Sequence, residues 1–264
     1  MDHDDPLVIL GNRLRAERER YATEVLNSRP FQDALDYLES ITSHLLIAQT
    51  YVCLQGSRFS AGDDYLLFRF APHLAEAALA VTFCAKEGMQ NAARRELRFL
   101  LEAAVKLSSQ DFNNDATTFE DRLTGLGDRT KRFEDYVAEL QYFDKFEKPE
   151  EANTEALSLY SELSHYVHAS VPQFENAIAR SRRGESPGME TVATLNRFNK
   201  LAFRVYDLVL VRIFYGIGIS LAGDIFTSNL DDEPKWRFHK GKFVGRMSCC
   251  FDYKHERRVR RGEI

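Results

Sequence analysis

Nonpolar residues recur every three or four positions along most of the chain, the spacing that one buried helix face requires. Between residues 31 and 54, for example, they stand at 35, 38, 41, 45, 46 and 52. Glycine, proline and small polar residues gather between such stretches and indicate loops. The pattern predicts helices over about 6–27, 31–54, 64–86, 90–109, 117–146, 154–180 and 188–227, with a break in 117–146 at Gly125 and Gly127.

These helices predict an all-α multi-helix bundle of about seven helices. Residues 1–29 hold a charged N-terminal helix, 30–228 the bundle, and 229–264 a short basic tail rich in aromatic residues. Helix 188–227 is nonpolar around nearly its whole circumference, so we expect this long C-terminal helix at the centre. Its longest uncharged run has 11 residues, whereas a membrane-spanning helix needs about 20.

Composition narrows the class further. The 264 residues are 44% hydrophobic and 28% charged, which is typical of a folded globular chain. The acidic N-terminus differs from the basic start of a signal peptide, and four cysteines are too few for a disulfide framework. We therefore expect a cytoplasmic protein that does not contact a membrane.

The sequence predicts no metal and no other cofactor. The tail contains His239, Cys249, Cys250 and His255, but its two cysteines are adjacent instead of separated by two to four residues as in zinc sites. The chain also lacks a His-Glu-x-x-His motif.

Charge is distributed unevenly between the body and the tail. Residues 235–264 contain ten basic and three acidic residues, a net of +7, so the rest of the chain carries -12 of the total of -5. Basic residues interleaved with aromatic ones suit a single-stranded nucleic acid. The candidate contacts are Lys235, Trp236, Arg237, Lys240, Lys242, Arg257, Arg258, Arg260 and Arg261. Alternatively, the aromatic residues pack on the bundle; a small hairpin around 240–242 is a further expectation.

Two predicted helices carry candidate catalytic residues. In helix 90–109, Arg98 and Glu102 belong to a charged stripe opposite the nonpolar face. In helix 154–180, His168 lies at the edge of the nonpolar face, where an imidazole is half-buried and its pKa is tunable. Helix 188–227 adds Asp207 and Arg212, and buried charges need partners. We therefore expect these five residues to form one polar cluster, which serves either catalysis or helix register.

The same residues carry a family resemblance. Arg98-Phe99-Leu100-Leu101-Glu102 and the segment from Tyr160 to His168 resemble an uncharacterised bacterial all-helical family with an Arg-x-Leu-Leu-Glu helix and a Tyr-x-x-Leu-Ser-x-Tyr-Val-His helix. The resemblance covers about residues 30–220, and no function is established for that group.

A more distant similarity is to HEPN-type helical bundles, which include metal-independent ribonucleases of defence and toxin-antitoxin systems. Their catalytic pattern has four to six residues between an Arg and the following His, and none of the seven His here follows an Arg at that spacing. Arg69 and His73 are separated by only three residues. This departure counts against ribonuclease activity and leaves the bundle architecture untouched.

Two functions follow from these patterns. The first is a cytosolic helical interaction module in a bacterial defence or mobile-element setting, with a protein partner or self-assembly into a homo-oligomer and weak nucleic-acid binding through the tail. The alternative is a ribonuclease that uses His168 as base and Arg98 or Arg212 to stabilise charge on a phosphate.

Overall fold

The protein is an all-helical bundle, as predicted. The computed structural model describes residues 6–57, 64–112, 118–127, 130–140, 142–167, 170–182, 188–251 and 253. Within these residues there are eleven α-helices, more than the seven expected, and no strand. Their bounds are α1 Pro6–Tyr21, α2 Arg29–Gly56, α3 Leu66–Lys86, α4 Gln90–Asp111, α5 Phe119–Leu126, α6 Phe133–Ala138, α7 Pro149–Ser164, α8 Val171–Arg182, α9 Val192–Gly216, α10 Ile219–Ile225 and α11 Lys242–Ser248.

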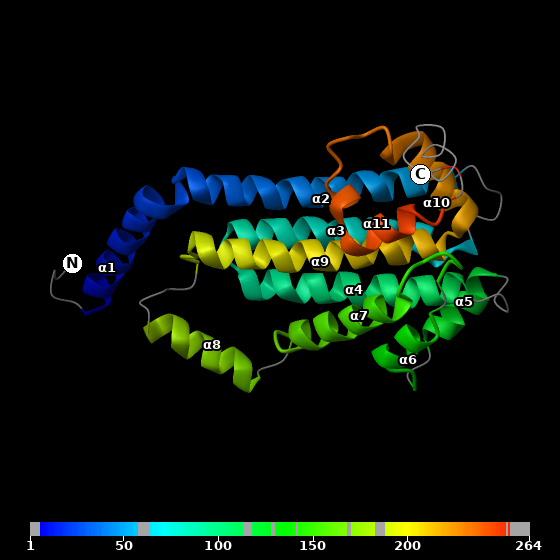
Figure 1. The fold of residues 1–264 in the computed structure, drawn as a ribbon. Helices are drawn as coiled ribbons and strands as arrows, with labels where there is room; N and C mark the ends of the chain where they lie inside the picture. Colours follow the sequence, from blue (N-terminus) through cyan, green and yellow to red (C-terminus); the bar gives the residue numbers. More distant parts are fainter. Residues whose placement is uncertain are drawn as a thin grey trace.

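Four long helices form the centre of the bundle. α9 packs against α2 and α4, and α3 packs against the same two helices (Figure 1). Every residue from Val205 to Gly216 on α9 is buried, so the nonpolar C-terminal helix lies in the core. By length and composition alone, α3 is able to cross a membrane, but 39% of its most nonpolar window is buried against the rest of the protein.

The predicted helix 188–227 is interrupted near its end. α9 stops at Gly216, and Gly218 has a φ of +85°, a left-handed backbone conformation that glycine adopts most readily. Gly216 meets a different need, because a Cβ there would lie 3.0 Å from the Cα of Ser108 on α4. One glycine therefore allows close helix packing and the other breaks the helix.

The predicted helix 154–180 is wrong in its bounds. α7 begins earlier, at Pro149, and ends at Ser164, and a turn then separates it from α8. Proline fits the first position of a helix, where its missing N–H is not needed. The break expected at Gly125 and Gly127 is confirmed, because α5 ends at Leu126 and α6 begins at Phe133. α5 is capped by Thr118 and Asp121, whose side chains each bond the other's backbone nitrogen.

The described part of the tail folds back onto the bundle. A short 3-10 helix, η4 (Arg237–Lys240), precedes α11, so the expected hairpin around 240–242 is wrong. Trp236 and Phe238 are buried, and the ring of Phe238 stacks on Phe203 of α9 with centroids 5.1 Å apart. Because these two aromatic side chains are buried, the segment that carries them forms part of the core of the bundle.

Helices α1 and α8 lie at the periphery, at the same end of the molecule (Figure 1). No residue of α1 is buried, as its dense charges predicted. α8 carries Val171, Phe174 and Ile178 on one exposed face.

Candidate functional site

The side chain of Arg98 joins α4 to α7. Its Nε donates a hydrogen bond to the Ser164 hydroxyl at 3.1 Å, and its Nη2 donates to the Tyr160 hydroxyl at 2.6 Å. Its Nη1 forms an ion pair with Glu102, one turn later on α4, at 3.3 Å. The structure thus brings together Arg98 and Glu102, as predicted, and adds Tyr160 and Ser164. We call these four residues the Arg98 cluster.

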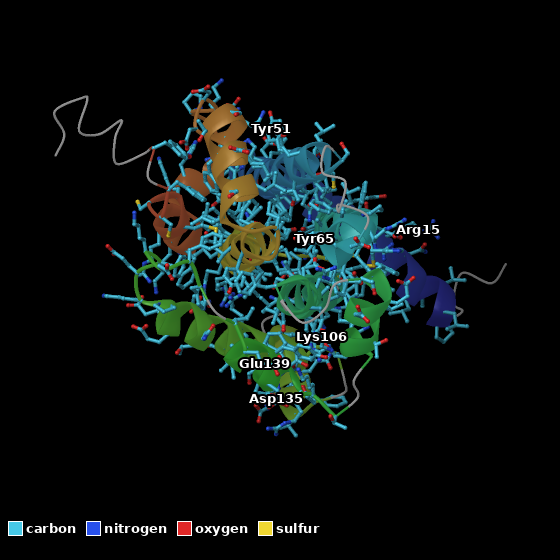
Figure 2. All side chains as sticks on the ribbon, turned by 90° about the vertical axis from the view of Figure 1, so that its right-hand side faces the viewer. Arg15, Tyr51, Tyr65, Lys106, Asp135 and Glu139 are labelled. Carbon is cyan, nitrogen blue, oxygen red and sulfur yellow. The ribbon has the colours of Figure 1, made fainter. Side chains whose placement is uncertain are left out.

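Further contacts hold the Arg98 cluster in place. Glu102 also pairs with Lys106 at 2.7 Å. Lys106 lies on the side of α4 that faces α6, the helix that carries Asp135 (Figure 2), and its ammonium is 5.6 Å from the Tyr136 ring. The guanidinium of Arg98 lies 4.6 Å from the Tyr160 ring, whose other stacking partner is Phe133 at 3.9 Å. Such cation–π and ring contacts add to the hydrogen bonds.

The Arg98 cluster therefore has the geometry of a clamp between two helices. All three nitrogens of the Arg98 guanidinium have partners within the protein, and the Ser164 hydroxyl donates to the Tyr160 carbonyl at 2.6 Å. About one fifth of the Arg98 side chain is exposed. His168, the expected base, lies outside the described residues.

Arg212 lies elsewhere and does not join the Arg98 cluster. It is fully buried on α9, where Nη2 donates to the hydroxyl of Tyr142 and to the side-chain oxygen of Asn153, the latter at 3.1 Å. Asn153 precedes Tyr160 by two helical turns of α7, which is about 10 Å along the axis. Burial lowers the pKa of the Arg212 guanidinium.

Asp207 forms a third, separate site. Its carboxylate accepts hydrogen bonds from the backbone nitrogens of Phe243 and Val244, both at 2.9 Å, and so caps the N-terminus of α11. Burial raises its pKa to about 6. The predicted five-residue cluster is therefore wrong: among its described members, only Arg98 and Glu102 come together.

The basic residues of the tail have two different environments. Lys242 and Arg246 form ion pairs with Glu151 of α7 at 3.0 and 2.8 Å. Hydrogen bonds from Arg246, which has the largest effect, and from Lys242 and Lys148 lower the pKa of Glu151 to about 2. Lys235, Arg237 and Lys240 are exposed. Arg257, Arg258, Arg260 and Arg261 lie outside the described residues.

Trp236 is not available for stacking on a nucleobase. Its ring is 2% exposed, and its Nε1 donates a hydrogen bond to the backbone oxygen of His44 on α2 at 3.0 Å. The expectation that Trp236 stacks on a base is wrong for this fold, because the indole fills the space between α2 and the described part of the tail.

A groove lies between α3 and α4, and the sequence pattern does not predict it. It has a volume of about 510 Å³. Its walls carry Phe70, His73, Glu76, Ala77 and Ala80 from α3, with Glu96 and Phe99 from α4. We call it the α3–α4 groove. The one residue whose position in the sequence is unusual here is Phe99, which stands beside the charged stripe of its helix and is 45% exposed.

Comparisons with known proteins add no identity: the chain matches no family of proteins, no curated protein and no solved structure. In the part of the chain that the structure describes, no group of three or more His, Cys, Asp or Glu side chains is placed to hold a metal ion. The fold and the site thus define an all-helical bundle in which the Arg98 cluster joins two helices, Arg212 is buried and the α3–α4 groove is open.

Proposed function

We propose that the protein is a helical interaction module that binds a basic, amphipathic segment of a protein partner in the α3–α4 groove. The observation that carries this proposal is that Glu76 and Glu96 line the same groove as the nonpolar rings of Phe70 and Phe99. Nonpolar walls bury the nonpolar face of a helix, and carboxylates in the same groove select a partner with arginine or lysine beside that face.

The two carboxylates have no partner cation among the described residues. Neither Glu76 nor Glu96 has an ion pair with any described residue of the protein. Partial burial raises the pKa of Glu96, and the negative charge of Glu76 raises it further. A basic side chain from a partner relieves both effects, because it supplies the missing opposite charge.

The nonpolar surface beside the groove supports the same function. Phe83 is 64% exposed on α3, and Phe99 is exposed on α4. Single exposed nonpolar residues are common, but aromatic rings beside an open groove favour an interaction surface.

The Arg98 cluster supports binding over catalysis. The guanidinium of Arg98 is engaged by Tyr160, Ser164 and Glu102, and Arg212 is buried. Neither is presented to a phosphate, so the ribonuclease alternative is the weaker proposal. Incubation with labelled RNA tests it: cleavage by the wild type that His168→Ala abolishes without loss of stability would establish the enzyme.

A synthetic amphipathic helix with leucines on one face and flanking arginines is the direct probe of the groove. We expect Glu76→Gln/Glu96→Gln to weaken its binding about tenfold in fluorescence anisotropy, because two attractive charge pairs are lost. The matched control is Glu87→Gln/Glu175→Gln, which removes the same charge outside the groove. No binding by the wild type, or equal weakening by both double variants, would contradict the proposal.

A second binding function, for single-stranded nucleic acid, is favoured by the exposure of Lys235, Arg237 and Lys240. We propose that these residues contact phosphates together with basic residues beyond position 251. Each phosphate contact on a single strand adds about -0.7 to the slope of log affinity against log salt. Lys235→Gln/Lys240→Gln should therefore reduce that slope by more than one unit, and an unchanged slope would exclude these lysines.

A further inference from the structure

Helix α1 carries basic and nonpolar side chains, which complement the acidic and nonpolar walls of the α3–α4 groove. Leu10 and Leu14 lie one turn apart on α1 and are about half exposed. At 100° per residue, Arg13 and Arg18 flank this leucine pair on its two sides. Arg13 has an ion pair with Glu17 at 3.5 Å, but its side chain is 76% exposed, and such surface pairs are weak.

The groove and α1 are complementary in charge and in polarity. The groove has two carboxylates and two phenylalanines, and α1 has arginines beside leucines. Leucines on the phenylalanine walls place the flanking arginines near Glu76 and Glu96. Opposite charges beside buried nonpolar contacts fix the orientation of such a helix in its groove.

We propose that α1 of a second copy of this chain occupies the α3–α4 groove, so that the protein forms a homodimer. This inference rests on the proposed function of the groove and names its partner. Within one chain, α1 extends away from α3 and α4 (Figure 1), and its exit from the bundle is held by the hydrogen bond from the Tyr21 hydroxyl to the Glu190 carbonyl at 2.9 Å. A second copy is therefore needed to supply it.

The direction of α1 suits a reciprocal exchange. α1 leaves the bundle on the side where α3 ends and α4 begins (Figure 1). When two copies face each other on that side, each donates α1 and each offers a groove. The contact is then made twice around a two-fold axis, which closes the assembly at a dimer instead of a filament.

Sedimentation velocity with reciprocal charge reversal tests this dimer. We expect the wild-type chain to dimerise in a concentration-dependent manner. Arg13→Glu/Arg18→Glu on α1 and Glu76→Arg/Glu96→Arg in the groove should each weaken self-association at least about tenfold, because like charges then face each other. The control Arg15→Glu/Arg182→Glu changes the same charge away from the leucine face and should leave the dimer intact.

Mixing the two reversed variants is the decisive step. In the mixed pair, the acidic α1 of one chain meets the basic groove of the other, and the unchanged α1 meets an unchanged groove. Both contacts are then complementary, so we expect a heterodimer from two chains that are monomers alone. Circular dichroism of each variant establishes that it is folded; if arginine disrupts packing, Glu76→Gln/Glu96→Gln replaces the groove variant in the self-association measurement alone.

Three results would overturn the dimer: a wild type that stays monomeric, a dimer that survives both reversals, or two folded variants that do not associate on mixing. The proposed function is judged separately by the synthetic helix. A monomeric wild type that binds this probe in the groove refutes self-association and leaves the interaction module standing, with a basic helix of another protein as its partner.

Discussion

The carboxylate of Asp207 accepts a hydrogen bond from the backbone nitrogen of Phe243, which lies 36 positions later in the chain. The same carboxylate sits against Gly241, where any Cβ would overlap it. Asp111, at the end of α4, plays the same part for α3, because its two oxygens accept from the nitrogens of Leu66 and Leu67 at 2.7 and 2.8 Å. Two buried carboxylates thus cap the starts of helices that are distant in sequence.

The Asp207 cap makes stability depend on pH. Burial raises its pKa from 3.8 to about 6, so the folded protein holds this proton more tightly than the unfolded chain does. The resulting stabilisation is present below about pH 4 and is lost as the pH rises through 6, a difference of about 3 kcal/mol. Urea unfolding at several pH values measures it as the difference between the wild type and Asp207→Asn.

The control for this prediction is Asp224→Asn, which changes an exposed carboxylate on α10. Its pH profile should follow that of the wild type. A profile of Asp207→Asn that parallels the wild type between pH 4 and 6 would show that Asp207 keeps an ordinary pKa in the folded state.

Sequence patterns predicted the helices and could not predict these caps. The spacing of nonpolar residues depends only on local geometry, so α2, α3 and α4 lie close to their expected bounds. Asp64 stands just before α3 in the sequence, where a local capping residue is common, whereas Asp111 supplies the cap from another helix. Which distant carboxylate reaches a helix start depends on tertiary packing, and a single sequence does not record it.

Removal of the Arg98 clamp should lower stability in a cooperative way. A hydrogen bond to a charged group contributes about 1.5–3 kcal/mol when buried, and partial exposure reduces this. We expect a double-mutant cycle between Arg98→Met and Tyr160→Phe to give a coupling energy of about 1 kcal/mol from thermal or urea unfolding.

The matched cycle pairs Tyr160→Phe with Arg95→Met. Arg95 also reaches past α7, but it donates to the backbone oxygen of Tyr166. Changes at sites without a shared partner are additive within about 0.5 kcal/mol. Equal coupling in both cycles would mean that Arg98 and Tyr160 are not specifically joined.

Arg212 should be replaceable by a nonpolar residue of similar length. Its Nε and Nη1 have no hydrogen-bond partner among the residues that the structure describes, whereas Tyr142 and Asn153 also bond each other at 2.6 Å. Arg212→Met removes a buried charge and leaves that pair satisfied, so we expect equal or higher stability, by up to about 4 kcal/mol. Arg212→Ala should be several kcal/mol less stable, because it opens a cavity.

The same unfolding measurements decide the role of Arg212. A large loss of stability in Arg212→Met, comparable to that in Arg212→Ala, would show that the hydrogen bonds of the guanidinium outweigh the cost of burying it. Helix periodicity predicted the burial of Arg212 and missed its partners, because Tyr142 lies in a connection between helices whose path depends on the assembled bundle.

Trp236 should matter for folding and not for nucleic-acid binding. Its indole contacts Phe226 edge-on, with centroids 6.0 Å apart, and donates to His44. Truncation of a buried aromatic residue costs about 3–5 kcal/mol. In a chain of this size, that lowers the melting temperature by about 10 °C. We therefore expect Trp236→Ala to melt well below the wild type, while its affinity for single-stranded nucleic acid, measured where both are folded, stays unchanged.

The comparison variant for Trp236 is Lys235→Gln/Lys240→Gln, which should show the opposite pattern. These two lysines are exposed, so their loss should leave the melting temperature nearly unchanged and weaken binding in low salt. A Trp236→Ala protein that keeps its melting temperature and loses binding would mean that the indole leaves the core to stack on a base. That result would mean that the aromatic tail binds nucleic acid, and that its packing against α2 is an alternative conformation that competes with binding.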